Sequence, residues 1–75
     1  MEAQKPMPPR SKGIMLPNLK HERHRAGLTL RELSEKSGVG NDRISLIENG
    51  HSGAHGSTVR KLADALGVET RDLVG

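Results

Sequence analysis

The 75-residue sequence contains no cysteine and no phenylalanine, tryptophan or tyrosine. Without cysteine, the chain can form neither a disulfide bond nor a zinc site built on thiolates. Without Phe, Trp or Tyr, it lacks the large aromatic side chains on which many RNA-binding and single-strand-binding proteins stack bases. The core must therefore be aliphatic, in a domain near the size at which one core barely stabilises a fold.

Long hydrophobic runs are also absent. No apolar run approaches the ~18 residues that indicate a transmembrane helix, and no signal-peptide pattern is present. We therefore expect a cytoplasmic protein with no membrane partner.

Positive charge is concentrated at the start of the chain. Residues 1 to 25 carry six Lys or Arg against two Glu, whereas residues 26 to 75 carry six against seven acidic residues. The net charge of +3 fits a nucleic-acid partner.

The first stretch, MEAQKPMPPRSKG, holds three of the four prolines and little that a core could bury. We predict a flexible basic arm over residues 1–13 and a folded domain over residues 14–75. The arm is either an inert terminus or a DNA contact through Lys5, Arg10 and Lys12.

The central stretch TLRELSEKSGVGNDRISLIENG, residues 29 to 50, predicts two short helices joined by a tight turn. Thr29 is an N-cap with a glutamate three residues later, the spacing of a capping box. Gly38 ends the first helix because glycine adopts the left-handed C′ conformation without a Cβ penalty. The second helix begins at Gly40 or Asn41 and ends at Asn49.

Apolar spacing predicts further helices around this pair, with Asn18 capping the first and either His55 or Ser57 capping the fourth. They are expected over residues 18 to 26, 57 to 66 and 69 to 74. No strand pattern or internal repeat is visible, so the predicted fold is all-α.

The spacing of glycine, small and apolar residues in the central stretch resembles the DNA-binding helix-turn-helix. The longer string from Leu19 to Val68 contains L-K-x-x-R, G-L-T, G-V, I-S-x-I-E-N-G and K-L-A-D-A-L-G-V. This string is similar to the lambda-repressor-like (Cro and phage-repressor, XRE-type) helix-turn-helix family. The resemblance covers about fifty-five of the 75 residues, and only its combined spacing is specific. It implies a compact five-helix bundle that binds double-stranded DNA in a sequence-specific manner.

In that family the second motif helix lies in the major groove. The positions implied to face bases are Asn41, Asp42 and Leu46, with Arg43 and Ser45 at the flank. Asn41 can bond an adenine edge, Asp42 can accept from cytosine N4, and Leu46 can contact a thymine methyl group. The alternative is that these are ordinary solvated helix residues.

The phosphate-binding positions implied by the resemblance lie at two places. They are Thr29, Leu30 and Arg31 at the start of the first motif helix, and Asn49, His51 and Ser52 after the second. Leu30 and Leu46 depart from the family pattern, and two exposed leucines are also typical of a protein-binding surface. A protein-interaction module, such as an antitoxin or adaptor, is therefore the alternative function.

Similar proteins pair an arginine of the first helix with a glutamate that closes the reading helix. Here these residues are Arg23 and Glu48, and a bidentate pair would tie the two helices together. We expect the pair to orient the helices more than to stabilise them.

Four histidines raise the question of a metal site. His21 and His24 are three apart, and His51 and His55 share a loop, but without cysteine or a carboxylate motif we interpret them as solvated. No serine has a suitable base partner, and no glycine-rich phosphate loop is present. We predict no metal, no cofactor and no enzymatic activity.

A single copy would read too few base pairs for useful discrimination. We therefore predict a transcriptional regulator, specifically a repressor, that acts as a homodimer on two half-sites. The expected dimer surface comprises Leu66, Val68, Leu73 and Val74. Any further protein partner or effector domain would lie outside this chain.

Overall fold

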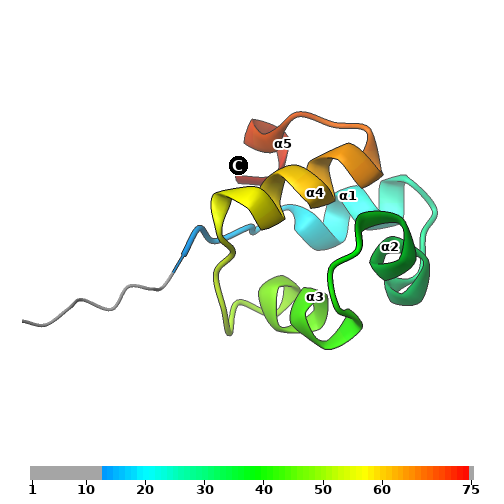
Figure 1. The fold of residues 1–75 in the computed structure, drawn as a ribbon. Helices are drawn as coiled ribbons and strands as arrows, with labels where there is room; N and C mark the ends of the chain where they lie inside the picture. The colour runs from blue at the N-terminus through cyan, green and yellow to red at the C-terminus, as the bar shows by residue number, and fades with distance from the viewer. Residues whose placement is uncertain (1–12, 75) are drawn as a thin grey trace, which may run out of the picture.

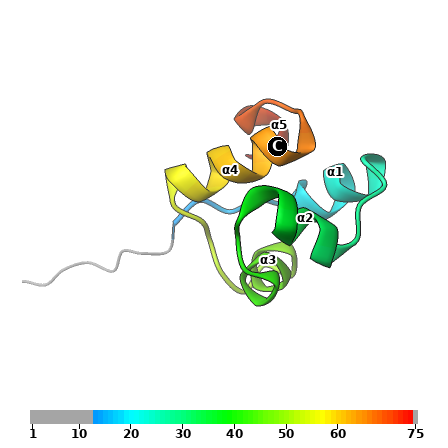
Figure 2. The same ribbon diagram turned by 45° about the vertical axis from the view of Figure 1, so that its right-hand side comes forward.

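The computed structural model describes residues 13–74 of the chain. Within them, five helices pack around one core: α1 (Leu19–Arg25), α2 (Leu30–Ser37), α3 (Asn41–Glu48), α4 (Gly56–Leu66) and α5 (Thr70–Val74) (Figure 1). The all-α prediction is therefore confirmed. α4 packs against both α2 and α5, while α1 contacts α3 and α5. α3 and α5 lie on opposite sides of the domain in both views (Figures 1 and 2).

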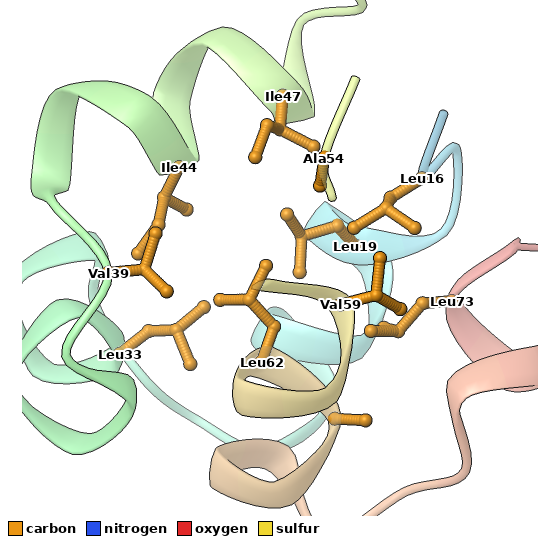
Figure 3. Close-up of a cluster of buried hydrophobic side chains, with 11 residues drawn as sticks. Leu16, Leu19, Leu33, Val39, Ile44, Ile47, Ala54, Val59, Leu62 and Leu73 are labelled. Atoms are coloured by element: carbon orange, nitrogen blue, oxygen red, sulfur yellow. The ribbon is translucent and has the colours of Figure 1, made fainter. Parts of the chain in front are cut away.

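The core is entirely aliphatic, as the absence of aromatic residues requires. Every helix contributes to it, and so do the segment before α1, the turn after α2 and the loop before α4 (Figure 3). Its buried residues are Leu16, Leu19, Leu33, Val39, Ile44, Ile47, Ala54, Val59, Leu62, Ala63 and Leu73. Because α3 and α5 share one core, their relative positions are fixed by the same packing.

The segment before α1 pairs with the loop that follows α3. Ile14 and Ala54 form an isolated antiparallel bridge, with N···O distances of 2.7 and 2.9 Å. A side chain at Gly13 would meet the Ala54 backbone nitrogen at 2.9 Å, so glycine is required there. Gly13, the last residue of the predicted arm, thus lies against the folded domain.

Asn18 differs from its predicted role. It occupies the N-cap of α1, but its side chain makes no capping hydrogen bond. Instead its Nδ2 donates to the Asp72 carbonyl at 3.1 Å, and its amide donates to the Leu73 carbonyl at 3.2 Å. The side chain therefore links the start of α1 to α5, a contact that no local pattern predicts.

The remaining helix bounds agree with the prediction to within about two residues. Of the two expected N-caps for α4, the structure has His55, without a side-chain capping bond. No helix in residues 13–74 is long and apolar enough to cross a membrane. The proposed DNA contacts of Lys5, Arg10 and Lys12 lie outside the described residues.

Candidate nucleic-acid interface

α2 begins with the predicted capping box. The Glu32 amide donates to Thr29 Oγ1 at 3.0 Å, and the Thr29 amide donates to Glu32 Oε1 at 2.8 Å. These bonds satisfy two backbone donors that the first turn cannot satisfy itself. In the described part of the chain, no partner is recorded for the amides of Leu30 and Arg31. They remain able to donate to an anion.

The turn between α2 and α3 is fixed by a glycine and two serines. Gly38 adopts φ +79°, the predicted left-handed stop. Ser34 Oγ donates to the Val39 carbonyl at 2.7 Å, and the Val39 amide donates to Ser37 Oγ at 3.1 Å. Both polar groups of Val39 are thus satisfied while its side chain enters the core. Ser34 is small enough for the helices to approach, but its hydroxyl bond was not predicted.

α3 presents one apolar face inward and one mixed face outward. Ile44 and Ile47 are fully buried. Four of the five predicted base-facing residues are exposed and the fifth, Ser45, is half-buried; the four are Asn41, Asp42, Arg43 and Leu46. The N-cap is Gly40, which makes no side-chain capping bond, so the positive end of the helix dipole is uncovered.

Arg23 and Glu48 lie together at the end of α3. Arg23 Nε donates to Glu48 Oε2 at 2.7 Å, and Arg23 Nη2 donates to Glu48 Oε1 at 3.2 Å. Arg23 Nη1 donates to the Leu28 carbonyl at 2.9 Å. Only 10% of the arginine side chain and 4% of the glutamate side chain are exposed. The structure brings this predicted pair together and buries it, which fixes α1 against the end of α3.

The predicted phosphate contacts at the start of α2 are unevenly exposed. Thr29 and Arg31 are exposed, and Arg31 Nε lies 3.7 Å from Glu35 Oε2. Leu30 is half-buried and packs against the core. Its expected exposure was therefore wrong, because the start of α2 turns this position toward the core. Its backbone amide still lies at the start of the helix.

The predicted contacts after α3 lie where the helix ends and the loop toward α4 begins. Asn49 and His51 are exposed, and the His51 amide donates to the Leu46 carbonyl at 2.9 Å. Ser52 is half-buried, and its hydroxyl donates to the Gly53 carbonyl at 3.1 Å. Asn49 and His51 can thus reach a ligand, whereas the Ser52 hydroxyl is engaged with the carbonyl of the next residue.

Two further features are the histidines and a surface pocket. The four histidines are all exposed, and residues 13–74 contain no group of three or more side chains placed to hold a metal ion. A shallow open pocket lies between the end of α1 and the turn after α4. It is lined by Glu22, Arg25, Ala26, Leu66, Gly67 and Val68.

Two short helices, a glycine-ended turn and an outward-facing second helix together define a helix-turn-helix protein. A family model described as helix-turn-helix matches residues 19–73, and the chain belongs to this XRE-type family of DNA-binding transcription regulators.

A solved structure supports the same assignment. The crystal structure of the restriction-modification controller protein C.AhdI from Aeromonas hydrophila is 30% identical, with a TM-score of 0.72. The match covers 75% of this chain and 85% of that chain. No curated protein sequence matches the chain.

Proposed function

We propose that the protein is a repressor that binds a specific double-stranded DNA sequence as a homodimer, with α3 in the major groove. The observation that carries this proposal is the outward face of α3, where Asn41, Asp42 and Arg43 are exposed beside a fully buried Ile44. A helix buried on one side and exposed on the other can enter a groove without unfolding the domain. Its place of action is then the cytoplasm, at the nucleoid in a bacterium.

The first turns of both motif helices complement a phosphate backbone. The amides of Leu30 and Arg31 can donate to a phosphate at the start of α2. Arg43 takes part in none of the ion pairs recorded for residues 13–74, so its guanidinium is available to a phosphate or to a base edge. It also offsets the charge of Asp42 beside it. The controller designation of the similar solved structure supports a regulatory role.

Pairing of two copies follows from the size of α3. Its eight residues reach only a few base pairs, so two copies on half-sites about one helical turn apart supply the missing discrimination. Of the four residues expected at the dimer surface, Leu73 is fully buried, Leu66 and Val68 pack against the core, and Val74 is exposed. Within residues 13–74, the large hydrophobic side chains exposed outside α3 are those of Ile14, Met15 and Val74. They lie in the two segments that Asn18 joins, and we assign the dimer surface to them.

The experiment is a salt titration of duplex binding, with random DNA and with DNA upstream of the protein's own coding sequence. Affinity is expected to fall steeply as salt rises, because bound phosphates release counterions. Arg43→Ala should weaken binding and flatten the salt slope by about one unit. Arg71→Ala is the charge-matched control, because Arg71 lies on α5, on the side opposite α3. Equal slopes for both variants would contradict the proposal.

The exposed Leu46 favours a second candidate, a protein-interaction module on the same scaffold. Nearly half of this side chain, 48%, is accessible on the outward face of α3. An apolar partner surface there would bind with little dependence on salt. The same titration therefore separates the two functions.

A further inference from the structure

The exposed face of α3 combines a carboxylate with a large apolar side chain. Leu46 follows Asp42 by four residues, so the two side chains are neighbours on the helix surface, about 5–6 Å apart at their Cβ atoms. The other large apolar residues of α3, Ile44 and Ile47, are buried, whereas Leu46 is 48% exposed. Leu46 therefore adds little to the core, and its apolar surface is free to contact a chemical group in the DNA groove.

Leu46 is held in a fixed position. The buried Ile47 follows Leu46 directly, and the Leu46 carbonyl accepts from the His51 amide at 2.9 Å. Two residues after Leu46, the buried carboxylate of Glu48 is bonded to Arg23. The leucine is thus presented by a rigid part of α3, which is what contact with one particular chemical group requires.

The Asp42 carboxylate limits which chemical group of the DNA can lie beside the group that Leu46 contacts. The ion pairs recorded for residues 13–74 involve the carboxylates of Glu22, Glu35 and Glu48, and not Asp42. An ionised carboxylate only accepts hydrogen bonds, and the major groove offers it the amino groups of cytosine N4 and adenine N6. Cytosine is the pyrimidine of the two, and its C5 position lies next to N4 on the same groove edge.

We propose that Leu46 packs on the C5-methyl group of a pyrimidine while Asp42 accepts from an amino group of the same base or of its neighbour. The Asp42 carboxylate accepts from an N4 amino group, and Leu46 packs on the methyl group. With 5-methylcytosine, one base satisfies both side chains. With thymine, O4 is an acceptor that repels the carboxylate, so Leu46 contacts the methyl group and Asp42 binds the amino group of a neighbouring base. This inference rests on the proposed function.

The test changes single methyl groups in a duplex that the protein has selected from a random pool. Each thymine is replaced in turn by uracil, and each cytosine by 5-methylcytosine, and Kd is measured by fluorescence anisotropy at fixed salt. We expect uracil at one position of a half-site to weaken binding about fourfold, or 5-methylcytosine at one position to strengthen it about fourfold, the effect of one buried methyl-sized group. The first result identifies thymine and the second identifies methylated cytosine.

Two variants assign the effect. Leu46→Ala should bind the methylated and unmethylated duplexes equally, because the apolar contact is gone. Arg43→Ala should weaken binding to both duplexes by the same factor and keep the methyl dependence. Since Leu46 is exposed, its truncation should leave the thermal unfolding curve nearly unchanged.

Each result either supports or overturns the proposed methyl recognition. The inference is overturned if a selected duplex is bound and no methyl change alters Kd, or if Leu46→Ala keeps the full methyl dependence. In both cases the proposed DNA-binding function still stands. If no duplex is selected or bound, the proposed function and this inference fail together.

Discussion

Removing the glutamate of the buried ion pair should destabilise the whole domain. In Glu48→Ala, Arg23 Nε and Nη2 lose the two carboxylate oxygens that now lie at 2.7 and 3.2 Å. The Leu28 carbonyl remains as a partner for Nη1, but the positive charge stays in a site where only 10% of the side chain is exposed. A buried charge without its partner is strongly destabilising, whereas an intact pair adds little net stability.

The expected loss is large compared with the stability of so small a domain. Breaking one side of a buried pair typically costs about 3–5 kcal/mol. A domain of this size is stable by roughly 4–11 kcal/mol, from the usual range per residue. Since 1 kcal/mol shifts the Tm of such a domain by about 4–8 °C, the lower limit of the cost predicts a fall in Tm of about 12–24 °C.

Circular dichroism at 222 nm during heating, with urea titration as a second measure, reads out this loss. The matched control is the double variant Arg23→Met/Glu48→Leu, which removes both charges and keeps apolar volume. It should recover much of the stability lost in Glu48→Ala, apart from about 1 kcal/mol for the Leu28 carbonyl. A fall in Tm of less than about 4 °C for Glu48→Ala would refute the reasoning, because it would mean that Arg23 is solvated.

Three further predictions concern the turn, the cap and the dimer. Gly38→Ala should cost about 1–2 kcal/mol in urea unfolding, because alanine is strained at φ +79°; an unchanged midpoint would contradict this. Thr29→Ala should cost about 1 kcal/mol by removing the capping bond, and Thr29→Ser should not. Met15→Asp should lower the dimer fraction in sedimentation equilibrium while leaving Tm unchanged at a concentration where the protein is monomeric; an unaltered dimer would place the interface elsewhere.

Local chemistry determines much of the fold, which is why the sequence predicted it. The capping box at Thr29 and the left-handed stop at Gly38 each depend on residues within one helical turn, and both occur as expected. Ile44 and Ile47 are three residues apart and therefore share one face of α3, which is the buried face. Such features need no knowledge of the rest of the chain.

The features that sequence reasoning missed depend on distant residues. Asn18 was expected to cap its own helix, but its amide group bonds to the Asp72 carbonyl, 54 residues away. Leu30 was expected on the surface, yet the angle at which α2 meets the core half-buries it. The sequence around Ile14 and Ala54 has no alternating strand pattern from which their pairing could be predicted. For the proposed DNA contacts, the fold determines which side chains are exposed. The base that each side chain contacts also depends on the DNA sequence that is bound.

The glycine at the start of α3 indicates that different residues stabilise the helix and form its exposed face. Gly40 caps α3 without a side-chain bond, and a Cβ added there would meet nothing within 4 Å. Aspartate would therefore fit, and it would improve the cap by a few tenths of a kcal/mol. However, its carboxylate would cover the amides of the first turn and repel a phosphate brought close to them. Rigidity is supplied instead from the inner side, by Ile44, by Ile47 and by the buried Arg23–Glu48 pair. The exposed residues of α3 are therefore not needed to stabilise the helix, so their identity can depend on the DNA sequence that they contact.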